Sequence, residues 1–234
     1  MLRFNSDHKF KIMQIADTQE IPAVSPDTLS LINNALDREK PDLVIFTGDQ
    51  IKGYSKKFKK DPAIIESTID ILVEPIAKRN IPFMVTYGNH DAQCGIDNRG
   101  QYKFYAKYDN FISGDLRNSY DVGTADIQIY SSTEDKPVFE LYIIDSHGKA
   151  KDGAGYAPVD KKQIEWYVSR REQLKAENGG YLPSLVFQHI PVPEFFDVIK
   201  KVPKGTKGAV PAYGAHENEY FVLNDETIAD GGFM

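Results

Sequence analysis

The sequence has one cysteine, no long apolar run and no excess of positive charge. The single cysteine, Cys94, excludes an intramolecular disulfide framework, so the fold has to be held together by a packed core. No stretch approaches the roughly 18 consecutive apolar residues of a membrane span. The first residues also lack the apolar centre of a signal peptide. We therefore predict a cytoplasmic protein that makes no contact with a membrane.

The charge balance and the missing motifs exclude further classes of protein. A net charge of -6 argues against a protein that binds nucleic acid through a basic surface. The sequence has no Gly-x-Ser-x-Gly and no glycine-rich phosphate loop, which disfavours a serine hydrolase of the α/β type and a P-loop nucleotide-binding protein. With 234 residues, 41% of them hydrophobic, the chain is long enough for a sizeable core, and one domain over residues 1–234 is the simplest expectation.

Short apolar runs rich in Val, Ile and Phe recur along the chain and predict buried strands. They cover residues 11–16, 42–48, 81–88, 138–144 and 185–188. The residues that follow them can bind a metal or move a proton: Asp17, Asp49, Asn89 with His90 and Asp91, Asp145 with His147, and His189. If these strands share one sheet, their carboxyl ends bring these groups together at the edge where α/β proteins place their sites.

Three helices are predicted between the apolar runs. Ser25-Pro26 and Asp61-Pro62 are typical helix starts, and Asp160 caps a third helix that ends at Gly179. Residues 119–130 and 138–144 form a predicted hairpin. The aromatic segment 95–114 is interpreted as a helix packed on the sheet, with a wall of a substrate pocket as the alternative. Strands that alternate with helices predict an α/β fold.

Residues 48–50 and 88–91 carry the clearest chemical signals. Their glycines allow a sharp turn at the end of a strand. Asp49 offers two oxygens, enough to bridge two metal ions, and Asn89 offers a neutral amide oxygen. His90 is better suited to proton transfer, and Asp91 could hold its ring in one tautomer.

Asp17, Gly48-Asp49, Gly88-Asn89-His90-Asp91 and His189 together resemble the calcineurin-like metallophosphoesterase family. The family pattern is Asp-x-His, Gly-Asp, Gly-Asn-His-Asp/Glu, a lone His and then Gly-His-x-His. Residues 187–194 and Gln163-x-x-Trp166 resemble its purple-acid-phosphatase-related branch. The resemblance implies an α/β sandwich of two mixed β-sheets flanked by helices. It also implies a binuclear-metal enzyme that hydrolyses a phosphate mono- or diester.

The resemblance also implies a role for each matching residue. Asp17 would bind the first metal ion, Asp49 would bridge both ions, and Asn89 and His189 would bind the second. His90 would be the catalytic acid and Asp91 its orienting partner. The cofactors would be two divalent or trivalent ions of the Mn, Fe or Zn class, and the partner a small phosphorylated substrate.

Two departures from the family pattern change this expectation. Gln19 stands where the family has the histidine of Asp-x-His. It can therefore serve only as a weak metal ligand or as a residue that positions another ligand. No Gly-His-x-His occurs in the sequence. We interpret the chain as lacking its C-terminal part, or as a degenerate family member. We then expect low metal occupancy, weak or absent hydrolysis, and self-association through an exposed sheet edge.

Other residues have no fixed place in the pattern. His147 is given a structural or supporting role, while His8 and His216 are expected to be exposed. The basic run 56–60 is interpreted as a solvated loop, with phosphate steering as the alternative, and residues 203–218 as an irregular surface loop. The alternative to an enzyme is a family member that has kept the fold, lost catalysis and acts as a binding protein.

Overall fold

The computed structural model describes residues 1–112, 119–150, 155–192 and 194. Its strands are β1 (Leu2–Arg3), β2 (Ile12–Ile15), β3 (Leu43–Thr47), β4 (Phe83–Thr86), β5 (Ala125–Tyr130), β6 (Pro137–Ile144) and β7 (Ser184–Gln188). Its α-helices are α1 (Pro26–Glu39), α2 (Pro62–Lys78), α3 (Asn98–Ala106) and α4 (Lys161–Asn178). Two short 3-10 helices complete the list, η1 (Lys56–Phe58) and η2 (Asp91–Cys94).

The three predicted helices begin at the residues that the sequence indicates. Ser25 and Asp61 cap α1 and α2 by accepting backbone N–H groups, and each helix has proline in its first turn. Asp160 forms a capping box with Gln163 at the start of α4, which ends on Gly179 with a positive φ of 74°. These local signals depend on residues adjacent in the chain, which is why the sequence alone locates them.

The first sheet consists of β2, β3 and β4, all parallel, with β3 in the centre. Every residue of β3 is buried, and the strand alternates between two hydrophobic layers. Val44 and Phe46 pack beneath α1 and α2, while Leu43 and Ile45 face the second sheet. A parallel sheet covered on both faces requires such an uninterrupted apolar strand.

The second sheet has the strand order β1, β5, β6 and β7 and is mixed. β5 and β6 form the predicted antiparallel hairpin, whereas β1 pairs with β5, and β7 with β6, in parallel. Leu141 and Ile143 point toward the first sheet and join the shared core. β1 and β7 are the edge strands of this sheet within the described residues, and Leu185 and Val186 of β7 are exposed. Self-association through this edge stays a prediction.

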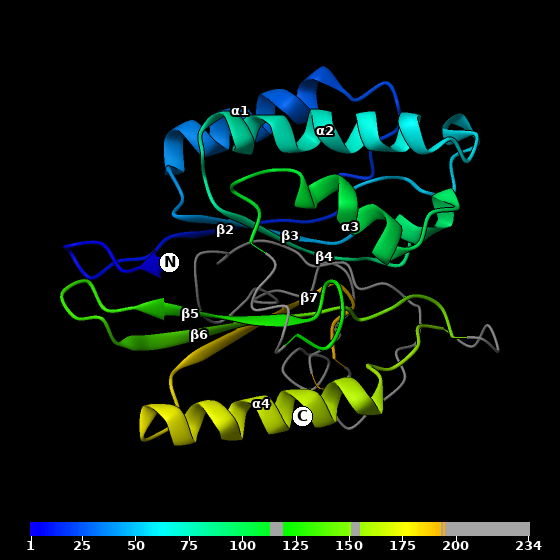
Figure 1. The fold of residues 1–234 in the computed structure, drawn as a ribbon. Helices are drawn as coiled ribbons and strands as arrows, with labels where there is room; N and C mark the ends of the chain where they lie inside the picture. The colour runs from blue at the N-terminus through cyan, green and yellow to red at the C-terminus, as the bar shows by residue number, and fades with distance from the viewer. Residues whose placement is uncertain (113–118, 151–154, 193, 195–234) are drawn as a thin grey trace, which may run out of the picture.

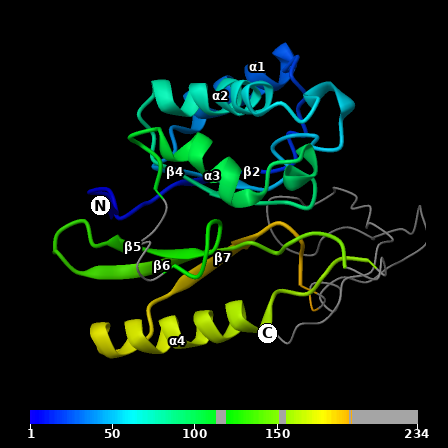
Figure 2. The same cartoon turned by 45° about the vertical axis from the view of Figure 1, so that its right-hand side comes forward.

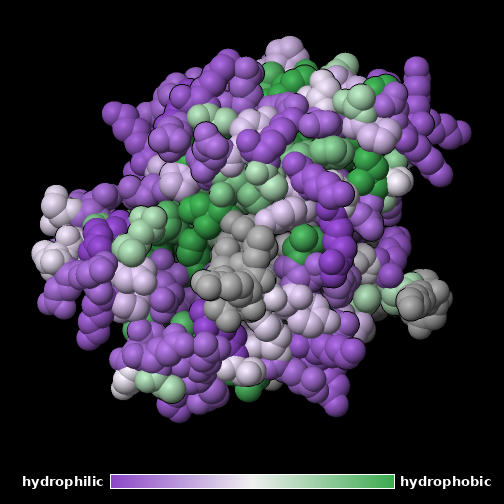
Figure 3. Space-filling view, viewed as in Figure 1, coloured by the Kyte–Doolittle hydropathy of each residue, from purple (hydrophilic) through white to green (hydrophobic). Residues whose placement is uncertain are grey.

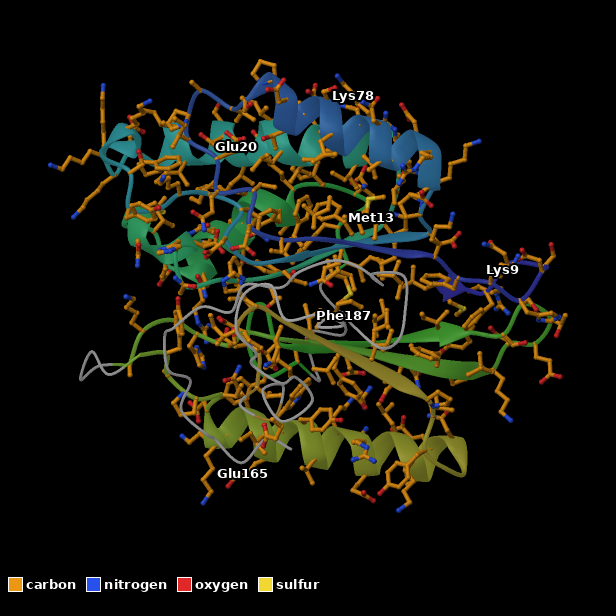
Figure 4. All side chains as sticks on the ribbon, turned by 180° about the vertical axis from the view of Figure 1, so that it is seen from behind. Lys9, Met13, Glu20, Lys78, Glu165 and Phe187 are labelled. Carbon is orange, nitrogen blue, oxygen red and sulfur yellow. The ribbon has the colours of Figure 1, made fainter. Side chains whose placement is uncertain are left out.

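The elements form four layers (Figure 1). α1 and α2 cover one side of the first sheet, the second sheet packs on its other side, and α4 closes the far side of the second sheet. A view turned by 45° keeps this order (Figure 2). In Figure 4, Phe187 lies between the two sheets, whereas Lys78 and Glu165 lie on the outer faces of α2 and α4. These outer faces are largely hydrophilic (Figure 3).

The sandwich of two helix-flanked sheets confirms the predicted fold class, with two differences of detail. The site-bearing strands are divided between two sheets instead of sharing one, and the first sheet is wholly parallel. The segment 95–114 contributes the nine-residue helix α3, whose Tyr105 is buried in the core. The basic run 56–60 contains η1, which is anchored by the buried Phe58.

Some expectations fall beyond the part of the chain that the structure describes. The predictions for His216 and for the loop 203–218 belong to this group. The prediction of one domain over residues 1–234 that lacks its C-terminal part stays a prediction. His8 is exposed as expected. Among the described residues, we find no helix with both the length and the hydropathy needed to cross a bilayer.

Candidate metal centre

The loops after β2 and β3 run side by side and carry the first two candidate ligands. The backbone N–H of Asp17 donates to the carbonyl of Gly48 at 3.0 Å, and that of Gln19 donates to the carbonyl of Asp49 at 2.9 Å. These bonds extend the parallel ladder beyond the strands. Asp17 and Asp49 have left-handed backbones, with φ values of 54° and 55°. Non-glycine residues in this conformation are uncommon, and they are found at turns, at helix ends and at functional sites.

Two glycines allow the loop after β3 to approach the loop after β4. A Cβ on Gly48, whose φ is 105°, would lie 2.5 Å from the backbone nitrogen of Gly88. A Cβ on Gly88 would lie 2.2 Å from Oδ1 of Asp49. A side chain at position 48 would displace the backbone of Gly88, and one at position 88 would displace the Asp49 carboxylate. Steric contact between the two loops therefore explains both glycines.

Asp91 fastens these two loops together. Its carboxylate accepts the N–H groups of Asp49 and Gly88, both at 2.8 Å, and that of Ile51 at 3.3 Å. The side chain is buried, and this burial together with the charge of Asp49 raises its pKa to about 7, against the opposing effect of the backbone donors. Asp91 therefore holds the two loops together. The structure does not show its predicted role as the orienting partner of the His90 ring, because that ring contacts Gln93 instead.

His189 reaches the first sheet from the end of β7 in the second sheet. Its Nδ1 lies 3.0 Å from the carbonyl oxygen of Thr47, which can only accept, so Nδ1 carries the hydrogen. Its Nε2 lies 3.1 Å from Oδ1 of Asn89 and 3.5 Å from Oδ2 of Asp49. In the neutral ring, the lone pair of Nε2 thus faces two oxygen acceptors.

The space between His189 Nε2, Asn89 Oδ1 and Asp49 Oδ2 is suited to a cation, because all three atoms can offer lone pairs. Ligand atoms of Asp17, Asp49 and His189 lie within 4.8 Å of one another, and Asn89 borders the same space. Burial lowers the pKa of His189, but the carboxylates of Asp49 and Asp17 outweigh this effect and raise it above its ordinary value. A histidine that donates from one nitrogen to a backbone carbonyl and turns the other toward carboxylates has the arrangement usual for a metal ligand.

Asp17 and Gln19 lie at the open side of the centre. The side chain of Asp17 is 55% exposed, whereas that of Asp49 is 2% exposed. The amide nitrogen of Gln19 donates to Oδ2 of Asp49 at 3.4 Å. In this arrangement Gln19 supports the Asp49 carboxylate and turns its nitrogen, not its oxygen, toward the centre.

His90 lies on the other side of Asp49, at the rim. Its backbone N–H donates to Oδ1 of Asp49 at 2.8 Å, and its ring Nε2 lies 3.9 Å from Oδ2 of the same carboxylate. Its Nδ1 lies 3.0 Å from the amide oxygen of Gln93, which makes Nδ1 the donor. The ring also meets the partly exposed ring of Tyr54, with centroids 4.7 Å apart. His90 can therefore exchange a proton through Nε2.

The structure thus gathers Asp17, Asp49, Asn89 and His189 at one place, with Gln19 and His90 beside Asp49. Sequence reasoning missed Gln93, which follows His90 by three residues and takes the place foreseen for Asp91. Sequence reasoning also named no partner for His147. In the structure, His147 Nε2 lies 2.6 Å from the amide oxygen of Gln163, a residue that the helix start at Asp160 could have indicated.

The profile of the family described as calcineurin-like phosphoesterase matches residues 10–228. The chain belongs to this family. Membership confirms the resemblance found in the sequence and accounts for the position of the candidate metal centre at the strand ends. It identifies the chain as a metallophosphoesterase family member and implies divalent metal ions as the cofactors.

Curated family members support the purple-acid-phosphatase-related branch. Probable inactive purple acid phosphatase 14 of Arabidopsis thaliana is 28% identical over 230 residues, which cover 83% of this chain and 56% of the relative. Phosphatase DCR2 of Saccharomyces cerevisiae is 32% identical over 234 residues, which cover 88% of this chain and 39% of the relative. The chain therefore spans about half of one relative and two fifths of the other.

A solved structure supports the fold of the calcineurin-like phosphoesterase. The crystal structure of a dimetal phosphatase from Danio rerio matches with a TM-score of 0.52 and 13% sequence identity. The match covers 78% of this chain and 70% of that chain. At this identity the likeness concerns the fold alone.

Proposed function

We propose that the chain is a metal-dependent phosphohydrolase that cleaves a phosphate mono- or diester of a small molecule at a binuclear centre. The observation that carries this proposal is the lone pair of His189 Nε2, which faces Asn89 Oδ1 and Asp49 Oδ2 at 3.1 and 3.5 Å. Acceptors that face one another in a largely buried space repel unless a cation or a proton lies between them.

Asp17, Asp49, Asn89 and His189 would hold the ions. Carboxylate and amide oxygens combined with an imidazole suit ions of the Mn, Fe or Zn class. When bound, such ions polarise the phosphoryl oxygens of a substrate and offset the negative charge that develops on them. The chain contributes the arrangement of the ligands, which Asp91 and the two close glycines hold in place.

His90 would donate a proton to the leaving alkoxide. Its Nδ1 hydrogen is engaged by Gln93, so Nε2 is the atom that can carry the transferred proton. The ring is 24% exposed and borders Asp49, which allows a substrate held at the centre to reach it. General acids in such positions contribute about 10²–10⁴-fold to the rate.

The second candidate function is a binding protein that has kept the fold and lost catalysis. Gln19 favours it, because an amide replaces an imidazole at a ligand position of the family pattern and here donates to Asp49. The names of two Arabidopsis relatives, probable inactive purple acid phosphatases 14 and 29, point the same way. Phosphatase DCR2, at 32% identity, points to activity.

Metal content and hydrolysis, measured on the same sample, separate the two functions. We expect the purified chain to bind Mn, Fe or Zn at low occupancy and to hydrolyse p-nitrophenyl phosphate or its bis ester slowly, because Gln19 replaces one imidazole ligand of the family pattern. A chelator should abolish this turnover, and added metal should restore it. Bound metal without turnover of either ester would favour the binding protein. A chain that takes up none of these ions would overturn both the metal centre and the enzyme.

A further inference from the structure

A second feature lies beside the metal centre. A cavity of about 290 Å³ is formed between η2, the start of α3, the loop before β5, the end of β6 and the start of α4. Its wall comes from residues far apart in the sequence: Ala92, Asp97, Asn98, Arg99, Tyr120, Asp121, Val122, Thr124, Asp145, His147 and Gln163. None of these residues is needed to explain how the metal ions are held.

The turn 145–148 connects this cavity to the centre. Ser146 Oγ accepts the N–H of Ile190, the residue after His189, at 2.9 Å. The Cβ position of Gly148 is 3.7 Å from the Cα of Asn89. The same turn that lines the cavity therefore touches the segments that carry two candidate ligands, and a substrate bound at the centre has the cavity next to it.

The cavity wall is a built hydrogen-bond network. The buried carboxylate of Asp145 accepts the side-chain amide of Asn98 at 2.7 Å and the N–H of His147 at 2.9 Å. The amide oxygen of Asn98 is buried and has no hydrogen-bond partner within the described residues. Buried polar atoms without partners are rare in folded proteins, and a ligand hydroxyl or amine satisfies such an acceptor.

His147 is fixed in one tautomer within this network. Gln163 donates its amide N–H groups to Thr124 and to the carbonyl of Asp145, both at 2.9 Å, so its oxygen faces the imidazole. Nε2 of His147 therefore carries a hydrogen, which leaves Nδ1 as the other polar atom of the ring. His147 also has a positive φ of 61°, a conformation that needs local support in a residue with a side chain.

The charges around the cavity are unequal. Asp97, Asp121 and Asp145 contribute carboxylates. Among the described residues of the wall, Arg99 alone contributes a guanidinium, and it pairs with Asp121 at 2.8 Å. The described wall thus has more negative than positive charge. Such a wall favours ligands that carry N–H and O–H groups. It repels ligands that carry another negatively charged group besides the phosphoryl group.

We propose that this cavity is the subsite for the alcohol half of the phosphoester, and that it selects small alcohols with amino or hydroxyl groups over alcohols with a carboxylate or a second phosphate. The inference rests on the proposed function, because the metal centre would hold the phosphoryl group. The size supports a small alcohol, since about 290 Å³ lies just below the roughly 300–1,000 Å³ of ligand pockets.

Three phosphomonoesters of similar size test the selection: phosphoethanolamine, glycerol 2-phosphate and 2-phosphoglycerate. We expect kcat/KM for the amine ester to exceed that for the carboxylate ester about tenfold or more, as close like charges would impose. Asp145→Asn should reduce this ratio several-fold, and Arg99→Gln at an exposed position should increase it. The ratio is measured on one sample, so a change in metal content cancels.

Asp135→Asn is the matched control. This exposed carboxylate pairs with Arg3 at the turn between β5 and β6, at the opposite end of β6 from Asp145. Its ratio should equal that of the unaltered protein. Equal kcat/KM values for all three esters in the unaltered protein would overturn the subsite and leave the phosphohydrolase standing, even if Asp145→Asn fails to fold.

Binding of the free alcohols keeps the two proposals separable. Saturation-transfer NMR with ethanolamine and with glycerate, on the zinc-loaded protein, requires no turnover. We expect a signal from ethanolamine that Asp145→Asn weakens, and little signal from glycerate. This pattern without hydrolysis of any ester would contradict the enzyme while supporting the subsite. Equal signals from both alcohols would overturn the subsite.

Discussion

The two outer layers of the sandwich differ in what they bury. Beneath α1 and α2, the core of the first sheet is hydrophobic, with Val44, Phe46, Ile69 and Leu72 among its members. Between α4 and the second sheet, Arg170 pairs with the buried Asp126 at 2.9 Å, and Glu140 is buried nearby. One half thus packs by hydrophobic contacts, and the other also buries charges.

This difference follows from the two kinds of sheet. A parallel sheet covered on both faces favours apolar strands, and in this sheet the polar side chains other than Gln14 of β2 lie at the strand ends. Asp17, Asp49 and Asn89 all lie there. The mixed sheet buries polar groups along its strands and at their ends, and it supplies His189 and most of the cavity wall. The candidate site needs both halves.

The largest effect is expected from removing a metal ligand that the first sheet supplies. Asp49→Ala removes the carboxylate that lies beside His189, His90 and Gln19, so we expect metal binding to be lost and activity to fall at least about 10³-fold. Metal content is measured by mass spectrometry and turnover with p-nitrophenyl phosphate. Asp42→Ala, at the opposite end of β3, is the control and should keep both. Unchanged metal content in Asp49→Ala would contradict the assigned centre.

His90 and Gln93 test whether proton transfer is separate from metal binding. His90→Ala should lower kcat by about 10²–10⁴-fold while the metal content stays constant. Gln93→Ala should cost roughly tenfold, because the ring loses the acceptor that fixes its tautomer. If His90→Ala loses as much metal as Asp49→Ala, His90 is a ligand and its role as the acid is wrong.

The charges buried in the second half should appear in the pH dependence of stability. Burial and the neighbouring Asp126 raise the pKa of Glu140 to about 8, although Arg170 opposes them. The folded state therefore holds a proton that the unfolded chain releases near pH 4.5. Its stabilising effect is complete below that pH and is lost as the pH rises through about 8.

Glu140→Gln should remove this dependence. We expect the variant to exceed the unaltered protein in free energy of unfolding by about 1–3 kcal/mol at pH 8, and to differ little at pH 4. Urea denaturation followed by circular dichroism at both pH values measures the difference. Glu165→Gln, on the outer face of α4 in Figure 4, is the matched control. A difference that grows toward low pH would contradict the assignment.

The smallest expected effect compares one helix start in each half. Asp61 caps α2 and Asp160 caps α4, each by accepting an N–H of the first turn at 2.9 and 2.8 Å. Asp61→Ala and Asp160→Ala should each lower the free energy of unfolding by about 1 kcal/mol. Equal losses in one cooperative transition indicate that the two halves unfold together. A separate early transition in Asp160→Ala alone would show that the polar half opens first.

The elements themselves could be predicted from the sequence because their signals are local. The helix starts at Ser25, Asp61 and Asp160 and the apolar strand runs are read from neighbouring residues. The motif glycines indicated sharp turns after β3 and β4. Gly48 has the positive φ of such a turn, whereas the structure requires Gly88 for its close approach to Asp49. The family pattern indicated Asp17, Asp49, Asn89 and His189 as one group.

The contacts of individual side chains were decided by the tertiary structure. Asp91 and Gln93 both follow His90 closely. The family resemblance favoured Asp91 as the partner of the ring, and no local pattern indicated Gln93. Asp91 points into the interior because the N–H groups of Asp49, Gly88 and Ile51 converge there, and Gln93 is left to meet the ring. Likewise, His147 and Gln163 meet only because α4 packs on the end of β6.

The sequence by itself determined which residues end the strands, because apolar periodicity and turn chemistry depend on neighbours along the chain. Only the tertiary structure decided which strand ends meet. His189 reaches Asp49 because two separate sheets pack face to face through Leu43, Ile45, Leu141 and Ile143. The cavity exists because four chain segments converge beside that junction. Such packing depends on the shape and burial of residues distant in the chain, which no local pattern encodes.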